Sequence, residues 1–228
     1  MAPNPRTLRV LITGANRGIG LALVERCLEA NHHVHATARD LPAAVALHAL
    51  ASERLMLHPL DVRDDASCRA LGAAIGGRPI DLLINNAGIG RHATDDPAEI
   101  LAVFDTNAVG PLRVVNALRD NVRAARGKIL FITSVLGSIG ENSSGEAYAY
   151  RMSKAALNMA GKNLAHELRP EAVTAVLVHP GWVKTDMGGP RAPVTVDTAA
   201  SQILALAEKI TLADSGRFLH VDGTQLPW

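Results

Sequence analysis

Cysteine is scarce in this sequence, and the two cysteines do not form a recognisable site. Cys27 and Cys68 are the only ones among 228 residues. Each lies in a segment whose pattern predicts a helix, and neither has a second cysteine at metal-ligand spacing. The sequence therefore offers no disulfide framework and no cysteine-based zinc site, and we expect two reduced thiols in a reducing compartment.

Long apolar runs and an excess of one charge are also missing. Lys and Arg total 23 against 22 Asp and Glu, so the chain as a whole has no attraction for nucleic acid or an anionic membrane. Residues 1–6 hold no apolar signal core, and no apolar stretch approaches membrane-spanning length. We expect a soluble, cytoplasmic protein that binds neither nucleic acid nor membrane.

A metal site is not expected either. His32, His33 and His35 cluster around one predicted strand, but alternation sends successive side chains to opposite faces. No carboxylate or cysteine completes a ligand set there.

Short apolar runs of strand length alternate with longer helical patterns along the chain. The near-continuous apolar character of the runs suits parallel strands that are covered on both faces. Repeated β–α alternation implies a doubly wound α/β sheet, and no repeat or linker divides the chain, so residues 1–228 are expected to form one domain. The expected strands are 8–13, 34–38, 55–60, 82–85, 128–133, 174–178 and 218–221, and the expected helices are 19–30, 43–51, 66–75, 98–123, 147–169 and 196–210.

Three glycines lie between the first expected strand and the first expected helix. Gly14, Gly18 and Gly20 permit a tight turn whose backbone N–H groups point at a diphosphate. Their spacing differs from the Gly-x-Gly-x-x-Gly fingerprint, and no Gly-Lys-Ser/Thr follows that would make a P-loop. The strand–turn–helix context favours dinucleotide binding over a glycine-rich turn that binds nothing.

Tyr150 and Lys154 are four residues apart in a predicted helix, so their side chains share one helix face. A phenol and an ammonium placed in this way are candidate partners in proton transfer. In unrelated sequences the same spacing usually belongs to an ordinary amphipathic helix. A second phenol, Tyr148, has Met152 four residues later and cannot pair with Lys154 in this manner.

Residues 13–20, the Asn-Asn-Ala-Gly segment 85–88 and the Tyr150/Lys154 pair follow one another in this order. Together they resemble the short-chain dehydrogenase/reductase family, and residues 179–189 and 222–224 resemble its sniffer and C-factor group of carbonyl reductases. The resemblance spans essentially the whole chain. It implies a Rossmann-type fold, a seven-stranded parallel sheet in the order 3-2-1-4-5-6-7, and a homodimer or homotetramer.

The end of the second expected strand bears on the choice of dinucleotide. Ala38 stands where NAD-preferring relatives usually carry an acid, and Arg39 follows it. Arg17, just before the second glycine of the turn, adds another cation. Either arginine alone could be a surface charge, but together they favour NADP(H), because cations neutralise a 2′-phosphate. The nearby Asp40 weakens this preference.

The resemblance implies further cofactor contacts. Asp61 and Val62 would meet the adenine, although Asp61 could instead cap the next helix. The backbone of Val183 and the hydroxyl of Thr185 would hold the nicotinamide carboxamide. The complete predicted set is Gly14, Asn16, Arg17, Gly18, Ile19, Gly20, Arg39, Asp61, Val62, Asn86, Ala87, Gly88, Tyr150, Lys154, Pro180, Val183 and Thr185.

The resemblance also implies catalytic roles. Hydride transfer to a carbonyl leaves negative charge on oxygen, so an acid must supply a proton near neutral pH. Tyr150 would be that acid. Lys154, together with the positive charge of the nicotinamide, would lower the pKa of the phenol, ordinarily about 10, and Lys154 would also bind the nicotinamide ribose. Ser134 would donate a hydrogen bond to the carbonyl oxygen. Asn107 would hold a water of the proton relay on a distorted helix, which Pro111 makes plausible by removing a backbone donor; without the resemblance, Asn107 is a polar residue on a long helix.

The serine assignment departs from the family spacing. Family members commonly carry this serine thirteen residues before the tyrosine, and that position is Gly137. Ser134, sixteen before, ends the fifth expected strand, and Ser138 is the alternative if that strand ends later.

The sequence thus predicts an NADPH-dependent oxidoreductase that reduces ketones and aldehydes, with a small-molecule carbonyl or alcohol as its partner. The short segment 188–193 predicts an open, permissive site, in which Trp182 either walls the substrate pocket or is structural. The rival functions are an NAD-linked alcohol dehydrogenase and a dinucleotide-binding signalling protein of C-factor type.

Overall fold

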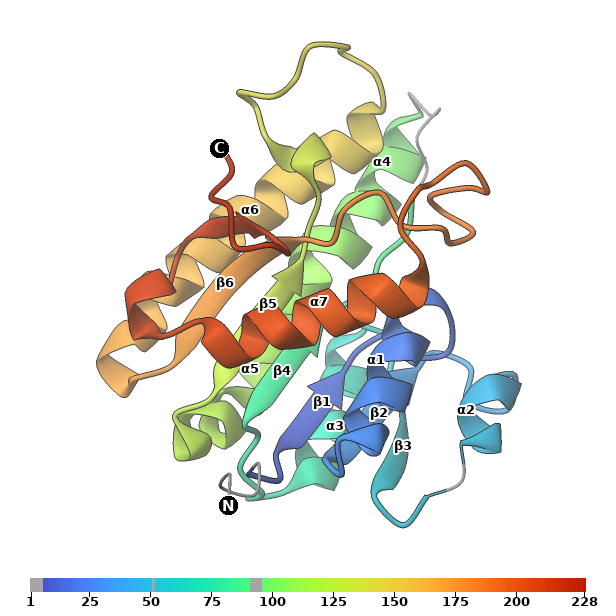
Figure 1. Ribbon diagram of the computed structural model, residues 1–228, viewed down its shortest axis with the longest axis vertical. Coiled ribbons are helices and arrows are strands. Elements are labelled where there is room, and N and C mark those ends of the chain that lie inside the picture. The colour runs from blue at the N-terminus through green and yellow to red at the C-terminus, as the bar shows by residue number, and fades with distance from the viewer. Residues whose placement is uncertain (1–5, 51, 91–95) are drawn as a thin grey trace.

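The structure, a computed structural model, describes residues 6–50, 52–90 and 96–228 and contains one sheet of seven parallel strands (Figure 1). The strand order is β3-β2-β1-β4-β5-β6-β7, which confirms the predicted order. Residues 1–5 and Ala51, the expected last residue of the second helix, lie outside the described residues. The strands are β1 (Arg9–Ile12), β2 (His33–Ala38), β3 (Leu55–Pro59), β4 (Leu82–Asn85), β5 (Lys128–Ile132), β6 (Thr174–His179) and β7 (Phe218–His220).

Helices cover both faces of the sheet. Figure 1 shows α1 and α7 in front of the strands and α6 behind them. The α-helices are α1 (Gly18–Glu29), α2 (Val45–Ala49), α3 (Asp65–Ile75), α4 (Pro97–Phe104), α5 (Gly110–Ala125), α6 (Tyr148–Leu168) and α7 (Val196–Lys209). The shorter helical turns are η1 (Asp105–Val109), η2 (Val135–Gly137), η3 (Arg169–Glu171) and η4 (Leu212–Asp214).

Each face of the sheet has its own hydrophobic core, because side chains alternate along a strand. In β1, Val10 and Ile12 pack with residues of α1, α2 and α7. Leu11, between them, packs with residues of α3, α5 and α6. All three are fully buried, which explains why the strands read as continuous apolar runs in the sequence.

The long helix expected at 98–123 is interrupted. It consists of α4, the π-helical turn η1 and α5. Pro111, in the first turn of α5, has no N–H to donate to the carbonyl of Asn107 in an α-helical pattern. The chain therefore changes its hydrogen-bonding pattern where the sequence predicts a distortion.

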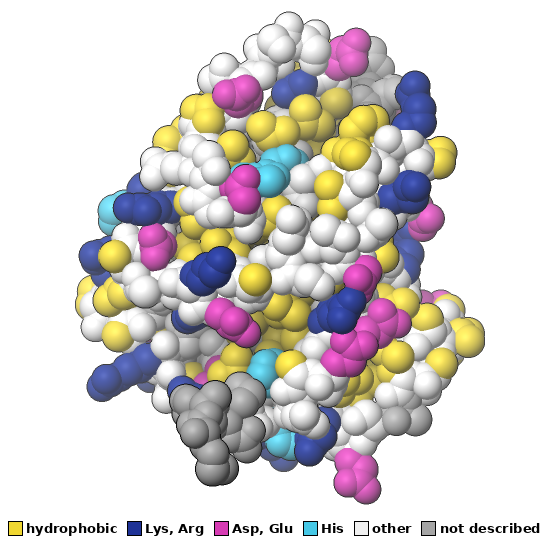
Figure 2. Space-filling view, in the orientation of Figure 1, with side chains coloured by type: hydrophobic (Ala, Val, Ile, Leu, Met, Phe, Trp, Pro, Cys, Tyr) yellow, Lys and Arg dark blue, Asp and Glu magenta, His cyan; other side chains and the backbone are white. Residues whose placement is uncertain are grey.

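Charges are interspersed over the molecular surface. On the face in Figure 2, acidic and basic side chains of the described residues alternate and do not gather into a region of one sign. This pattern agrees with a formal net charge of +1. Among the described residues, no helix has both the length and the apolar character needed to cross a membrane.

Candidate active site

A cavity of about 990 Å³ opens at the carboxyl edge of the parallel sheet. This is the edge where ligands bind in open α/β sheets, and the volume lies at the upper end of the range for ligand pockets. Its walls come from the turns that follow β1, β4, β5 and β6 and from α6. The predicted site residues that line it are Arg17, Gly18, Ile19, Asn86, Gly88, Ser134, Tyr150, Lys154, Pro180, Val183 and Thr185.

The glycine-rich turn after β1 lies tightly against the end of β4. Gly14 has φ +63°, and a Cβ there would lie 2.8 Å from the Cα of Ala87. A Cβ at Gly20 would collide with the Gly14 carbonyl oxygen. No described side chain caps the start of α1 at Arg17, so its first N–H groups are available to an anion at the pocket.

Asn86 and Thr13 hold the two turns together. The Asn86 Nδ2 donates to the carbonyl oxygens of Thr13 and Gly14, both at 3.0 Å. The Thr13 hydroxyl accepts from the backbone N–H groups of Asn86 and Ala87, also at 3.0 Å. This segment supports the turn mechanically while Asn86 and Gly88 face the cavity.

Ser134, Tyr150 and Lys154 meet in one wall of the cavity. They are 8%, 8% and 6% exposed. The Ser134 side chain hydrogen-bonds Tyr150, and the Lys154 Nζ lies 5.6 Å from the centre of the Tyr150 ring. Lys154 donates to the Ile132 carbonyl oxygen at 2.9 Å, which fixes the ammonium at the end of β5.

Burial dominates the protonation of this group. It raises the pKa of Tyr150 to about 12, with the hydrogen bond from Ser134 lowering it in part. It lowers the pKa of Lys154 to about 8. Desolvation of the phenolate thus dominates in the chain alone, and the expected lowering of the pKa of Tyr150, which also depends on the positive charge of the nicotinamide, stays a prediction. At neutral pH Tyr150 keeps the proton that an acid must donate.

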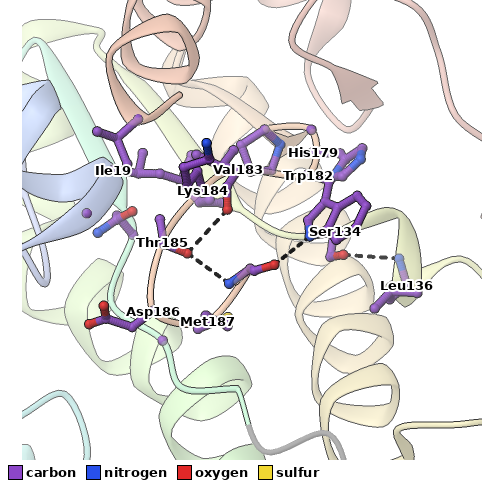
Figure 3. Close-up of a pocket in the computed structure, with 18 of the residues that line it drawn as sticks. Ile19, Ser134, Leu136, His179, Trp182, Val183, Lys184, Thr185, Asp186 and Met187 are labelled. Atoms are coloured by element: carbon purple, nitrogen blue, oxygen red, sulfur yellow. Dashed lines mark hydrogen bonds between the residues drawn. The ribbon is translucent and has the colours of Figure 1, made fainter. Parts of the chain in front are cut away.

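The two candidate serines lie in different places. Strand β5 ends at Ile132, and Ser134 lines the cavity, where it hydrogen-bonds Tyr150. Figure 3 shows the Ser134 hydroxyl accepting the backbone N–H of Leu136, at 3.1 Å. Ser138 is 2% exposed, does not line the cavity, and its hydroxyl accepts from the Glu141 N–H at 3.1 Å. This geometry favours Ser134.

Gly137, at the family's usual serine position, has no room for a side chain. A Cβ there would lie 2.8 Å from the Lys154 carbonyl carbon and 2.9 Å from the Lys154 Cβ. Contacts this short do not occur without a shift of the backbone of α6. A serine thirteen residues before Tyr150 is therefore incompatible with this packing.

Asn107 is fully buried in the π-helical turn. Its side chain donates to and accepts from the backbone of Ile89, both at 2.8 Å, and donates to the Ser153 hydroxyl at 3.0 Å. The side chain thus ties η1 to the loop after β4 and to α6. Asn107 does not line the cavity, although a Cβ at Gly88 would lie 3.2 Å from its Oδ1 and 3.8 Å from the Lys154 Nζ.

The predicted adenine side lies beyond the cavity. Arg39 is exposed at the end of β2, and Asp40 accepts the Ala43 N–H at 3.2 Å. Both oxygens of Asp61 are bound by Arg63, at 3.0 and 2.6 Å. Arg63, and to a smaller extent Arg39, holds the pKa of Asp61 down at about 2. Arg63 is not among the predicted site residues, although its place two residues after Asp61 in the sequence made this ion pair predictable.

The segment after β6 forms a further wall of the cavity, as Figure 3 shows for His179 and for Trp182 to Met187. The Trp182 Nε1 donates to the Gly188 carbonyl oxygen at 2.8 Å, and the Thr185 hydroxyl accepts the Gly188 N–H at 3.0 Å. Trp182 is 54% exposed and lines the cavity, so its indole both fixes the loop and borders the open side. Arg17 forms an ion pair with Asp186.

Not every predicted residue reaches the cavity. Those outside its lining are Gly14, Asn16, Gly20, Arg39, Asp61, Val62, Ala87 and Asn107. The glycines and Ala87 shape the turn from behind, Asn16 is an exposed residue of the same turn, and the others belong to the predicted adenine side or to η1.

Comparison with known proteins agrees with this geometry. The family model described as short chain dehydrogenase matches residues 8–194. The C-signal protein of Myxococcus xanthus is 42% identical over 165 residues, which cover 70% of this chain and 99% of that protein. The carbonyl reductase Sniffer of D. melanogaster superposes with a TM-score of 0.92 at 34% identity, over 98% of this chain and all of that one. An NADPH-bound carbonyl reductase from chicken fatty liver gives 0.91 at 38% identity, with the same coverage.

Proposed function

Since the chain belongs to the short-chain dehydrogenase family, we propose that it reduces ketone and aldehyde carbonyls with NADPH. The observation that supports this best is the burial of Ser134, Tyr150 and Lys154 together in a cavity that the glycine-rich turn also borders. The carbonyl reductase from chicken fatty liver, similar over nearly the whole chain, holds NADPH.

The chain's residues fit a dinucleotide. The positions of Gly14 and Gly20 leave no space for a Cβ, and this lets the backbone of the turn approach a diphosphate closely. Arg17 and Arg39 supply cations for a 2′-phosphate. Thr185 and the backbone of Val183, which line the same cavity as Tyr150 and Lys154, would hold the nicotinamide carboxamide.

When bound, NADPH supplies the hydride for the carbonyl carbon. Ser134 would donate a hydrogen bond to the carbonyl oxygen, and this stabilises the negative charge that develops there. Tyr150 would deliver its proton to the same oxygen. Lys154 would bind the nicotinamide ribose, and its ammonium favours the phenolate that remains. Asn107, through Ser153 and Ile89, would position η1 for the water that returns a proton.

A second candidate function has specific support. The similarity to C-signal favours a dinucleotide-binding signalling protein whose output is its binding state. An NAD-linked alcohol dehydrogenase is the alternative within the enzymes.

The deciding experiment is a screen of purified protein for NADPH oxidation with ketones, aldehydes and quinones. Turnover that depends on Tyr150 supports the reductase. NADPH binding without reduction of any carbonyl supports the signalling function, and turnover with NADH alone supports the NAD-linked enzyme.

The oligomeric state of the protein also stays a prediction. Large apolar side chains are exposed along α4 and α6, namely Leu101, Tyr148, Met152 and Met159. A homodimer or homotetramer would bury such a surface. Light scattering after size-exclusion chromatography measures the mass directly. One domain and a cytoplasmic location likewise stay predictions.

A further inference from the structure

Arg17 forms an ion pair with a residue of the loop after β6. Its Nη1 contacts the Asp186 Oδ2, and the two side chains are 63% and 78% exposed. Arg17 belongs to the turn after β1, and Asp186 belongs to the loop after β6, 169 positions later. The ion pair therefore joins the two segments that form the cofactor side of the cavity.

The two segments also approach each other between Gly18 and the side chain of Thr185. A Cβ at Gly18 would lie 3.4 Å from the Thr185 Cγ2. Thr185 in turn is held by the Gly188 N–H at 3.0 Å. Asp186 is thus presented to Arg17 by a constrained turn.

We propose that Asp186 is a specificity-determining residue, which competes with the cofactor's 2′-phosphate for Arg17. The inference rests on the proposed function, in which Arg17 neutralises that phosphate. The Arg17 guanidinium can form its full set of hydrogen bonds with the carboxylate or with the phosphate, but not with both at once. The phosphate displaces the carboxylate from Arg17, because the phosphate carries up to about two negative charges and three acceptor oxygens, whereas Asp186 carries one charge. NADPH therefore binds more weakly than it would without Asp186, whereas NADH, which has no 2′-phosphate, does not need Arg17.

The size of the effect follows from the exposure of the pair. Ion pairs between exposed side chains are weak, so breaking one costs roughly a two- to fivefold factor in affinity. Asp186→Asn should then tighten NADPH binding by about two- to fivefold and change NADH binding less. The preference for NADPH over NADH should rise accordingly.

The test is a set of dissociation constants from calorimetry for NADPH and NADH. The proteins are the wild type, Asp186→Asn, Arg17→Met and the double variant. Asp120→Asn is the matched control, because Asp120 is 83% exposed and pairs with Arg123 at 2.9 Å on α5, outside the cavity. It corrects for removing one negative charge from a protein that binds an anion.

The expected result is a gain for NADPH in Asp186→Asn that disappears in the Arg17→Met background, since the two residues then form a coupled pair. An equal gain in both backgrounds, an equal gain for NADH, or no gain beyond Asp120→Asn would overturn the inference. If Arg17→Met still weakens NADPH binding in those cases, the cofactor assignment stands. If Arg17→Met leaves the NADPH affinity unchanged and the wild type binds both cofactors equally, the assignment itself fails, and the inference with it.

Discussion

Gly137 packs directly on the backbone of Lys154, with 2.8 Å between the position of a Cβ at 137 and the Lys154 carbonyl carbon. Gly137→Ala should therefore displace the end of η2 or the part of α6 around Lys154, and lower the free energy of unfolding by about 1–3 kcal/mol, the usual cost of overpacking. Urea denaturation measures this. Gly77→Ala is the matched control, because nothing lies within 4 Å of a Cβ there. Equal stability of the two variants would contradict the packing argument.

Tyr150 and Tyr148 allow a comparison of two phenols on one helix. Tyr150 is 8% exposed and lines the cavity, whereas Tyr148 is 62% exposed. Tyr150→Phe should keep NADPH binding but lower turnover by about 10² or more, the scale of a lost general acid. Tyr148→Phe should change turnover little. Steady-state kinetics on a carbonyl that the wild type reduces measure both effects. Near-normal turnover of Tyr150→Phe would show that Tyr150 is not the proton donor.

Ser134 and Ser138 can be distinguished in the same assay. Ser134→Ala should cost about 10² in turnover, as loss of an oxyanion donor does, since its side chain reaches Tyr150 in the cavity wall. Ser138→Ala should be far milder in turnover, because its hydroxyl caps the Glu141 N–H. Adding Gly137→Ser to Ser134→Ala should not restore activity. The reverse ranking of the two alanine variants would move the assignment to Ser138.

The buried ammonium of Lys154 predicts a pH dependence of stability. Burial lowers its pKa in the folded chain to about 8, from an ordinary 10.5. Between these values the unfolded chain binds more protons, so this residue makes stability rise with pH from about 8 to about 10.5. Below pH 8 the full penalty of the buried charge is present.

Lys154→Met should remove that rise. The quantity to compare is the difference in free energy of unfolding between wild type and variant at pH 7, 8, 9 and 10, because the difference cancels other titrating groups. It should move in favour of the wild type as the pH increases. Lys209→Met, which removes an exposed ammonium outside the cavity, is the control. A constant difference for Lys154→Met would show that burial does not lower the pKa of Lys154, because the folded and unfolded chains would then bind the same number of protons throughout this range.

The sheet order could be predicted through the family resemblance that the motifs carry, and the place of the cavity could be predicted from local signals. Buried parallel strands read as apolar runs, and motifs at their carboxyl ends must meet at one edge of the sheet. Three features could not be predicted. The Arg17–Asp186 pair and the Gly137–Lys154 contact join residues far apart in the sequence, so no local spacing reveals them. The raised pKa of Tyr150 depends on how completely the fold excludes water.

Arg39 tests the choice of dinucleotide. It is exposed at the end of β2, its charge contributes to lowering the pKa of Asp61, and no acid precedes it at Ala38. NADPH should bind the wild type at least tenfold more tightly than NADH, about 1.4 kcal/mol. Arg39→Asp should narrow or invert this preference, since the new carboxylate repels a 2′-phosphate and can accept ribose hydroxyls.

Arg123→Asp makes the same change of charge on the last turn of α5, before β5 begins and outside the cavity. It should weaken the binding of both cofactors slightly, through the change in net charge alone, and change the ratio of their affinities much less than Arg39→Asp does. Dissociation constants for both cofactors with the three proteins separate the two effects. Equal affinities of NADPH and NADH for the wild type would overturn the cofactor assignment. A ratio that changes equally in Arg39→Asp and Arg123→Asp would show that Arg39 does not reach the 2′-phosphate.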